Sequence, residues 1–471
     1  MQAVSAFATC LLASVGGNSS AVVLPSQANY PNAVSPYNFD YPVKPAAVVY
    51  PQNAQQVAAA VKCAADAGVK VQAKSGGHSY GNYGSTTGEL SVNLQNLQQF
   101  SMDETTWTAT LGAGHRLGSV TELMYNAGGR HAPHGLTFTV GLGGHATVGG
   151  LGVASRQLGM TLDFVEEAEV VLANSSIVRA SKTQNTDLFF AVRGAASSVG
   201  IVTEFKIRTA PAPPSIIAYT YVWTAPDVAS RAQVFKAWQA WIADPALPRE
   251  LTPTLTVTPS VIVLAGTYFG TQAEFDAVNI TGRFPAAPQS TSAQVWTNFL
   301  EVSRFLSKQV DGSGTASPAY FYAKSLFVPP QGIVPDDLAD VMFEYLATAK
   351  NGTDLWALNF EALGGAVAEV SPTETAMVHR DASYVLFSYA RTTGKVSNTT
   401  VGFLDGLNEV LKSASPSAYY GEYGGCVDPK EDNYEARYNY YGQNLRRLEQ
   451  VKAAVDPKDV FHNQQSVRPR A

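Results

Sequence analysis

The chain has 471 residues, 45% of them hydrophobic, so it can bury a large core and its length predicts two or three structural units. Its formal net charge is −6 and only 15% of its residues are charged. It has no polybasic run that could neutralise phosphates, which argues against nucleic acid as a partner. No apolar run reaches the roughly 18 residues that span a bilayer, so we expect a soluble monomer without a membrane partner.

The N-terminal stretch AVSAFATCLLASVGG has the length of a signal-peptide core and also of a short buried helix. Only Met1 and Gln2 precede it, and the first basic residue is Lys44, whereas a secretory signal begins with positive charge. We interpret it as a mature N-terminus behind an added start Met, with the native signal peptide absent from this chain. Five glycosylation sequons favour secretion. They begin at Asn18, Asn174, Asn279, Asn351 and Asn398.

Three cysteines allow one disulfide and one spare thiol. A bond between Cys10 and Cys63 would tie the N-terminal helix to the next helix and leave Cys426 free. The alternative is three buried thiols.

Strands and helices alternate at the start of the chain. The β-branched run 46–51 is followed by a helical pattern over 53–68, with Asn53 as its cap, and by a strand over 69–77. This order predicts a βαβ unit. The turn KSGGHSYGNYGS, residues 74–85, therefore follows a strand, where backbone N–H groups can point at a phosphate.

A second glycine cluster, GLGGHATVGGLG, occupies residues 141–152. It begins like the dinucleotide fingerprint, through Gly141, Gly143 and Ala146. Three more glycines follow, and each costs roughly 1 kcal/mol inside a helix. We therefore expect a loop or bulged strand packed against a flat ligand.

The remaining chain divides at a Pro-rich exit near Ala210–Pro214. Before it, a hairpin turns at Asn174 and a helix, glycine loop and strand follow. From about 215 to 425, long apolar strands interleaved with helices predict an antiparallel sheet with helices on one face. The tail is a helix, a break at Asp456-Pro457 and an extended piece that we expect to fold back on the first domain.

Four motifs follow one another along the chain: K-S-G-G-H-S-Y-G, H-G-x-x-x-x-V-G-x-G-G-H, D-L-F-F-A-V-R-G and D-P-x-D-V-F-x-N. In this order, with HRD at 379–381, they resemble the berberine-bridge-enzyme-like flavoproteins of the vanillyl-alcohol oxidase fold, especially the fungal oligosaccharide oxidases. The resemblance covers nearly the whole chain. It implies an α+β fold with a PCMH-type FAD-binding domain at 1–212 (core about 42–212), an antiparallel-sheet substrate domain at 213–425 and a returning C-terminal segment at 426–471.

The resemblance implies FAD bound covalently through an imidazole nitrogen of His78. Without the resemblance, His78 would first be interpreted as a structural histidine. Thr137 stands where many relatives carry a second, cysteine tether and cannot form a thioether, so we expect a single histidyl link. Val140 stands at the position that governs oxygen access to the flavin in relatives, and its small side chain resembles that of the oxidases. The other predicted cofactor contacts are Ser75, Gly76, Gly77, Ser79, Tyr80, Gly81, Gly143, Gly144, His145, Gly149, Gly150, Gly152, Ile201, Val202 and Asn463.

An alcohol-oxidising flavoprotein needs a base for the hydroxyl proton. The resemblance implies that Tyr423 is this base, and it places Glu361 where the type enzyme of the fungal oligosaccharide oxidases has a supporting aspartate. Glu422 is a rival base, and the alternative is that YYGEY is only an aromatic strand edge. No metal is expected, because His131 and His134 have no Cys or carboxylate at ligand spacing.

The predicted substrate cleft is less polar than a long oligosaccharide requires. The resemblance to the type enzyme of the fungal oligosaccharide oxidases identifies its residues. Two tyrosines are retained, two glutamines are replaced and a charged pair is replaced; the residues are Tyr80 and Tyr320 (retained), Asn359 and Phe387 (in place of glutamines), and Thr254 and Thr256 (in place of the charged pair). Such walls suit a phenolic or allylic alcohol, or a sugar held by stacking. We predict a secreted oxidase that moves hydride from an alcohol or hemiacetal carbon to flavin N5 and reduces O2 to H2O2. The alternatives are a dehydrogenase with a quinone or protein acceptor and a low-turnover flavin-binding protein.

Overall fold

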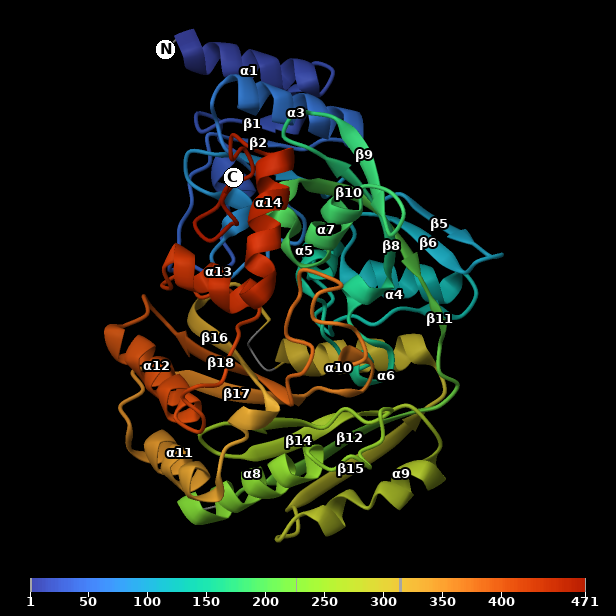
Figure 1. Ribbon diagram of the computed structural model, residues 1–471, viewed down its shortest axis with the longest axis vertical. Coiled ribbons are helices and arrows are strands. Elements are labelled where there is room, and N and C mark those ends of the chain that lie inside the picture. The colour runs from blue at the N-terminus through green and yellow to red at the C-terminus, as the bar shows by residue number, and fades with distance from the viewer. Residues whose placement is uncertain (1, 226, 313–315, 471) are drawn as a thin grey trace.

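The computed structural model describes residues 2–225, 227–312 and 316–470, which form three larger sheets, a separate two-stranded sheet and the helices around them (Figure 1). Two small sheets occupy the upper part of the view, and one large sheet with its helices occupies the lower part. The C-terminal helices return to the upper part. Among the described residues, no helix is both long and apolar enough to cross a bilayer.

The upper part is built on a mixed four-stranded sheet and an antiparallel five-stranded sheet. Their strand orders are β1-β2-β4-β3 and β5-β6-β10-β8-β9, and the parallel pairs are β2 with β4 and β3 with β4. The strands are β1 (Val22–Val23), β2 (Ala47–Val49), β3 (Val71–Lys74), β4 (Leu90–Asn93), β5 (Phe100–Asp103), β6 (Thr108–Gly112), β8 (Val165–Val171), β9 (Ile177–Ser181) and β10 (Ile201–Arg208), with β7 (Arg130–His131) and β11 (Ala210–Pro211) forming a separate pair.

Helices α1 (Gln2–Ser14) and α3 (Ala54–Asp66) pack side by side at the outer edge of this part (Figure 1). A disulfide between Cys10 and Cys63 joins them, with Cα atoms 5.8 Å apart, so the predicted pairing is confirmed. Asn53 caps α3 as expected, because its side chain accepts a hydrogen bond from a backbone N–H in the first turn. The other helices here are α2 (Tyr30–Ala33), α4 (Leu117–Asn126), α5 (Leu142–Val148), α6 (Ser155–Leu158) and α7 (Thr186–Val199).

The second glycine cluster forms a helix, so the expectation of a loop or bulged strand at its start is wrong. Helix α5 includes Gly143 and Gly144 and packs against α7. It ends at Gly149, whose φ of 146° is open to glycine alone. Only two glycines lie inside the helix, and a Cβ on Gly143 would come 2.8 Å from the carbonyl oxygen of Ala113. Close packing therefore outweighs the weak helix propensity of glycine.

The lower part contains a seven-stranded antiparallel sheet in the order β15-β12-β14-β13-β17-β18-β16. This sheet confirms the α+β fold class. Its strands are β12 (Ile216–Trp223), β13 (Thr254–Val257), β14 (Ile262–Tyr268), β15 (Ser290–Trp296), β16 (Tyr320–Val328), β17 (Leu355–Ala362) and β18 (Tyr384–Thr392). Helices α8 (Val228–Ile242), α11 (Asp336–Thr348) and α12 (Asn398–Lys412) cover its lower face, α9 (Gln272–Val278) lies beyond them, and α10 (Phe299–Gly312) lies between the sheet and α4 (Figure 1).

Alternation along the central strands separates a core face from a cavity face. Leu255, Leu358 and Leu386 are fully buried in the core formed with α8, α11 and α12. Their neighbours Asn359 and Phe387 therefore point to the opposite side, because successive residues of a strand alternate between faces.

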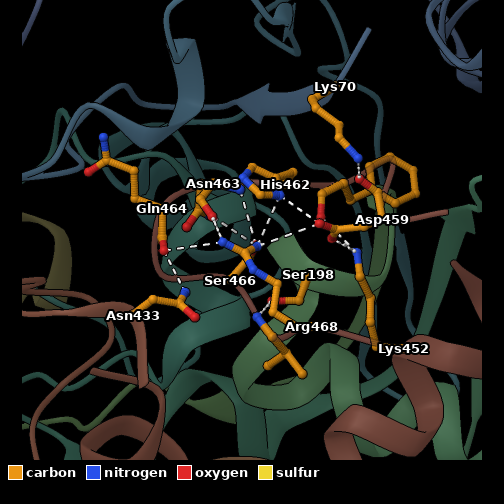
Figure 2. A network of polar contacts seen from close by, with 12 residues as sticks. Lys70, Ser198, Asn433, Lys452, Asp459, His462, Asn463, Gln464, Ser466 and Arg468 are labelled. Atoms are coloured by element: carbon orange, nitrogen blue, oxygen red, sulfur yellow. Dashed lines mark hydrogen bonds and ion pairs between the residues drawn. The ribbon is translucent and has the colours of Figure 1, made fainter. Parts of the chain in front are cut away.

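The C-terminal segment packs on the upper part through α13 (Asn433–Tyr441) and α14 (Leu445–Val455), and α14 contacts α7. A polar network then fixes the last residues (Figure 2). The Asp459 carboxylate pairs with Lys452 at 2.9 Å and with His462 at 2.6 Å, while Arg468 donates to the Asn463 carbonyl at 2.9 Å. This network holds residues 463–466 against the rest of the upper part.

Candidate active site

A cavity of about 1190 Å³ lies between the two parts of the molecule. The upper part contributes the turn after β3, the segment around α5 and the start of β10. The seven-stranded sheet contributes its upper face, and residues 423–427 and 463–466 complete the wall. All three predicted segments of the chain therefore meet at one site.

The turn after β3 is pinned to the N-terminal end of α5. Ser75 Oγ donates to the Ala113 carbonyl at 2.6 Å and accepts from Gly143 N at 3.3 Å. Gly76 and Gly141 lie so close that a Cβ on Gly76 would come 2.1 Å from the Gly141 nitrogen. Glycine is therefore required where these two backbones meet.

His78 lies in the cavity wall, with its ring centroid 4.4 Å from that of Tyr37. Burial and the nearby positive charge of Arg116 lower the pKa of His78 to about 4. Its imidazole is consequently neutral at physiological pH, and a neutral ring nitrogen has the lone pair that bond formation to carbon requires. This state fits the covalent role predicted for His78.

Most predicted cofactor contacts line the cavity, and three do not. Those in the wall are Ser75, Gly76, Gly77, His78, Ser79, Tyr80, Thr137, Val140, Gly143, Gly144, His145, Gly152, Ile201, Val202 and Asn463. Gly81, Gly149 and Gly150 lie outside it. A Cβ on Gly144 would meet no atom within 4 Å, so space remains beside this backbone. A cavity of about 1190 Å³ with a glycine-lined wall and a neutral imidazole fits a group of the size of FAD.

The phenol ring of Tyr423 is held between glycines. A Cβ on Gly149 would come 2.8 Å from Tyr423 Cε2, and one on Gly425 would come 2.4 Å from Tyr423 Cε1. Gly150 N donates a hydrogen bond to Tyr423 Oη at 2.9 Å. Gly149 and Gly150 thus position Tyr423, although the sequence interpretation placed them against the cofactor.

Tyr423 and Glu361 face the same cavity. Burial raises the pKa of Tyr423 well above its ordinary value, while the hydrogen bond from Gly150 lowers it. Burial also raises the pKa of Glu361 to about 7. The charge of Glu361 acts on Tyr423, so the two groups are close enough to interact. Together they provide a phenol and a carboxylate that can change protonation state at the cavity wall.

Glu422 lies outside the cavity lining, on the side of the chain away from Tyr423. Its side chain is 1% exposed and is next to Glu431 and Lys324. Burial and the neighbouring Glu422 raise the pKa of Glu431 to about 9, so Glu431 holds its proton at neutral pH. The structure therefore does not bring Glu422 to the position predicted for a rival base.

Strand register brings the predicted substrate residues into one row. Thr254 is opposite Glu361, Thr256 is opposite Asn359, and Asn359 is opposite Phe387. Thr256 Oγ1 donates to Asn359 Oδ1 at 2.8 Å. All five line the cavity.

Tyr80 also lines the cavity, but Tyr320 does not. Tyr320 packs edge-on against Phe39, with ring centroids 5.4 Å apart. Its predicted substrate contact is therefore not brought to the cavity wall.

Sequence reasoning missed several cavity residues. Thr252 and Thr258 extend the row of Thr254 and Thr256, and the alternating threonines of TPTLTVT were a period-two signal for one polar strand face. Cys426 also lines the cavity, because a turn in which Cys426 N donates to Tyr423 O at 2.8 Å brings it back beside the phenol. The sequence analysis identified Cys426 only as the spare thiol.

Comparisons with known proteins agree with this site. A model described as an FAD binding domain matches residues 45–181, and one described as berberine and berberine like matches residues 417–468. The chain is 63% identical to the FAD-linked oxidoreductase sorD of Penicillium rubens over the whole of both chains. The first family model covers the segment that contains His78, and the second covers the segment that contains Tyr423.

Two solved structures are similar over nearly the whole fold. Xylooligosaccharide oxidase from Myceliophthora thermophila, in complex with xylobiose, superposes with a TM-score of 0.90 at 31% identity, over 99% of this chain and 100% of that one. Glucooligosaccharide oxidase from Acremonium strictum, which has a 6-S-cysteinyl, 8α-N1-histidyl FAD, superposes with a TM-score of 0.88 at 30% identity, over 99% and 100% of the two chains.

The fold and the cavity define a two-domain FAD-binding flavoprotein of the vanillyl-alcohol oxidase type. The chain belongs to the berberine-bridge-enzyme-like family of FAD-linked oxidoreductases, and it is related to the fungal oligosaccharide oxidases. The family and fold predicted from the four motifs are therefore confirmed.

Proposed function

We propose that the protein is an FAD-dependent oxidase acting on the CH–OH group of a neutral alcohol or sugar. The observation that carries this proposal is that Tyr423 and Glu361 face one cavity together with His78. Bound FAD would supply the hydride acceptor. The residues of the chain would bind the substrate, orient it and remove its hydroxyl proton.

Tyr423 is the base in this proposal. The Gly150 N–H bond to Tyr423 Oη offsets part of the cost of a buried phenolate. Glu361, with a pKa of about 7, is largely ionised in mildly alkaline solution and can receive the proton that Tyr423 has taken up. The proton would thus move from the substrate hydroxyl to Tyr423 and then to Glu361.

A single covalent link through His78 is the second element of the proposal. Thr137 lines the cavity and has no sulfur, while burial raises the pKa of the Cys426 thiol to about 12, so this thiol is not ionised for attack on a flavin. Val140 lines the cavity and has a small side chain at the position that governs oxygen access in relatives, which supports O2 as the electron acceptor and H2O2 as the product.

The substrate wall supports a neutral substrate. Thr254, Thr256 and Asn359 offer uncharged hydrogen-bonding groups, and Phe387 offers an apolar face. The oligosaccharide oxidases among the relatives support a carbohydrate with a reacting C1-OH, whereas Phe387 supports a phenolic or allylic alcohol. Activity on each class distinguishes them.

Secretion is also proposed. The Cys10–Cys63 disulfide is typical of an oxidising compartment. Four sequon asparagines are exposed and the fifth is half-buried; they are Asn18, Asn174, Asn279 and Asn398 (exposed) and Asn351 (half-buried). A loss of mass after peptide N-glycosidase treatment of the protein from its native host would support this proposal, and an unchanged mass would contradict it.

The experiment for the flavin link is mass spectrometry of the peptide spanning residues 74–85 after acid precipitation. The peptide should retain the mass of FAD, and His78→Ala should release FAD into the supernatant. An unmodified wild-type peptide would overturn the link. For activity, an oxygen electrode screen of oligosaccharides and aromatic or allylic alcohols should show O2 uptake with equal H2O2 formation. Flavin reduction without O2 uptake would instead indicate a dehydrogenase.

A further inference from the structure

The imidazole of His78 is contacted by a residue from a separate segment of the chain. The ring of Tyr37 lies 4.4 Å from that of His78, measured between centroids, with 36° between the two planes. Tyr37 is buried and lines the same cavity. Two glycines precede His78, so the turn offers no side chain there to brace the imidazole. The ring of Tyr37 therefore limits the orientations that the imidazole can adopt.

The seven-stranded sheet helps to hold the ring of Tyr37. Phe321 of β16 meets this ring edge-on, with centroids 5.8 Å apart, and Tyr80 stacks on it at 6.3 Å. Tyr37 and Phe321 belong to one buried cluster that also includes Ala319. The position of Tyr37 therefore depends on residues of the lower part of the molecule.

Residues 37–41, the strap, bridge the two parts of the molecule. Phe39 N donates to the Ala319 carbonyl at 2.8 Å, and Ala319 N donates to the Tyr37 carbonyl at 3.1 Å. These bonds pair the strap with the residue that precedes β16. A strap paired in this way keeps its position only while the lower part is docked.

The Asn38 side chain makes a second bridge between the two parts. It is 1% exposed, and its Nδ2 donates to the carbonyls of Tyr80 and Phe321, both at 3.1 Å. Tyr80 belongs to the turn that carries His78, whereas Phe321 belongs to β16. One buried amide therefore joins this turn to the seven-stranded sheet.

Asn82 fixes the strap from the side of the turn. Its φ is 54°, a left-handed conformation that asparagine adopts more readily than most residues. Its Oδ1 accepts from the N–H groups of Tyr37 and Asn38 at 2.8 and 3.3 Å. Its Nδ2 donates to the carbonyls of Asn38 and Tyr41 at 2.8 and 2.9 Å. Only one orientation of the Asn82 amide satisfies all four bonds, so the strap and the turn are held in a single register.

We propose that the strap, through the ring of Tyr37, holds the His78 imidazole in the orientation required for its bond to the flavin. Tyr37 is the positioning residue, and Asn38 and Asn82 fix it. Because the strap is paired with the residue before β16, flavin attachment becomes fast only after the lower part has docked. The inference rests on the proposed covalent link through His78.

The atoms and electrons of the attachment step balance with O2 as the oxidant. Formation of the link replaces one C–H bond of the flavin methyl group and the N–H bond of His78 by a C–N bond. The two electrons and two protons released pass through the flavin ring to O2, which becomes H2O2. The chain supplies the neutral imidazole and its orientation, which is the contribution expected to limit the rate.

The test measures the rate of flavin attachment and needs no turnover. The full chain is made as apoprotein in a riboflavin-auxotrophic host and mixed with saturating FAD. Attached flavin is the fluorescence that remains with the protein after acid precipitation. Tyr37→Ala removes the ring beside His78, and Tyr37→Phe keeps it. Ala319→Pro removes the N–H that the lower part donates to the strap.

Asn38→Ala removes the bridge to β16, and Asn444→Ala is its matched control. Asn444 is also buried, and its Nδ2 donates to the carbonyls of Pro372 and Thr375 at 2.7 and 3.1 Å. It lies outside the cavity lining. The two variants therefore lose the same kind of side-chain bonds, one beside the turn of His78 and one away from it.

Tyr37→Ala, Asn38→Ala and Ala319→Pro should each slow attachment about tenfold or more, since misplacement of a reacting group by 1 Å has effects of this size. Tyr37→Phe should stay within twofold of the wild-type rate. Asn444→Ala should also stay within twofold, although its unfolding midpoint in urea falls about as far as that of Asn38→Ala. A merely structural role would slow Asn38→Ala and Asn444→Ala equally and would give no rescue by phenylalanine.

Refolding of the unaltered chain in the presence of FAD gives a second measurement. Of the six tryptophans, Trp107 lies in the upper part and the other five lie between residues 216 and 392, in the lower part. Tryptophan fluorescence therefore reports mainly on folding of the lower part. Attached flavin should appear only after this signal has recovered, and attachment that precedes the recovery would overturn the dependence on docking.

The outcomes separate the strap from the link itself. An unmodified wild-type peptide spanning residues 74–85 would overturn the proposed link through His78. A wild-type protein that attaches flavin, together with Tyr37→Ala and Asn38→Ala proteins that attach it within twofold of the wild-type rate, would leave the link standing and overturn the role of the strap.

Discussion

Replacing Gly149 by alanine tests whether the placement of Tyr423 limits the reaction. The φ of 146° at this position is strained for any L-residue, which costs about 1–3 kcal/mol. The new Cβ would lie 2.8 Å from Tyr423 Cε2, so the phenol must move by about 0.6 Å or more to regain ordinary contact. Such a shift also disturbs the 2.9 Å hydrogen bond from Gly150. We expect kcat to fall about 100-fold, since misplacements near 1 Å have effects of this size.

The assay is the steady-state rate of O2 uptake, together with FAD content and urea unfolding. The matched control is Gly402→Ala, in α12, where a Cβ would meet no atom within 4 Å. The control should keep its kcat and gain about 0.5–1 kcal/mol of stability, because alanine favours a helix over glycine. A Gly149→Ala protein that is less stable but keeps kcat within twofold would refute the assignment of Tyr423 as the base.

Three further predictions concern buried ionisable groups. The kcat of the wild-type protein should fall as the pH drops below about 7, where Glu361 becomes protonated. Glu361→Gln should lower kcat about 100-fold and abolish this dependence in a pH–rate profile. An inflection near pH 7 that persists in the variant would contradict the role of Glu361. Arg380→Ala removes the two hydrogen bonds, at 2.8 and 2.9 Å, that Arg380 donates to the buried Asp163 carboxylate. It should reduce the free energy of unfolding, measured in urea, by about 3–5 kcal/mol; a loss below about 1 kcal/mol would contradict the pairing. Because the folded-state pKa of Glu431 is raised to about 9, its contribution to stability is complete below about pH 4.5 and is lost as the pH rises through 9. Glu431→Gln should therefore flatten the decline of the unfolding midpoint between about pH 5 and 9; parallel curves would argue against the raised pKa of Glu431.

Local patterns in the sequence predicted the helices and strands that are stabilised by residues close together along the chain. Helix α3 follows from its apolar period and its Asn53 cap, and the antiparallel seven-stranded sheet follows from the long apolar strands between residues 215 and 425. Helix α5 was missed because the low helix propensity of its two glycines is outweighed by packing against α7, which only the folded chain shows.

The candidate site was predictable where a motif names a residue and less so where the fold chooses between neighbours. His78 and Tyr423 follow from motif positions, and both line the cavity. Glu422, adjacent to Tyr423, and Tyr320 do not, because chain direction and strand register decide which side chain faces the cavity. The sequence analysis identified Cys426 only as the spare thiol, although a single turn places it beside Tyr423.

The cavity wall includes Asn463, Gln465 and Ser466, which belong to the last ten residues of the chain and are held by the network around Asp459 (Figure 2). Protein synthesis proceeds from the N-terminus, and domains fold as units when their residues become available. The nascent chain can therefore form its large sheets before the cavity is complete. Assembly of the cofactor site therefore comes later in synthesis than formation of the sheets, and removal of residues 463–466 should leave a largely folded protein with an incomplete cofactor site.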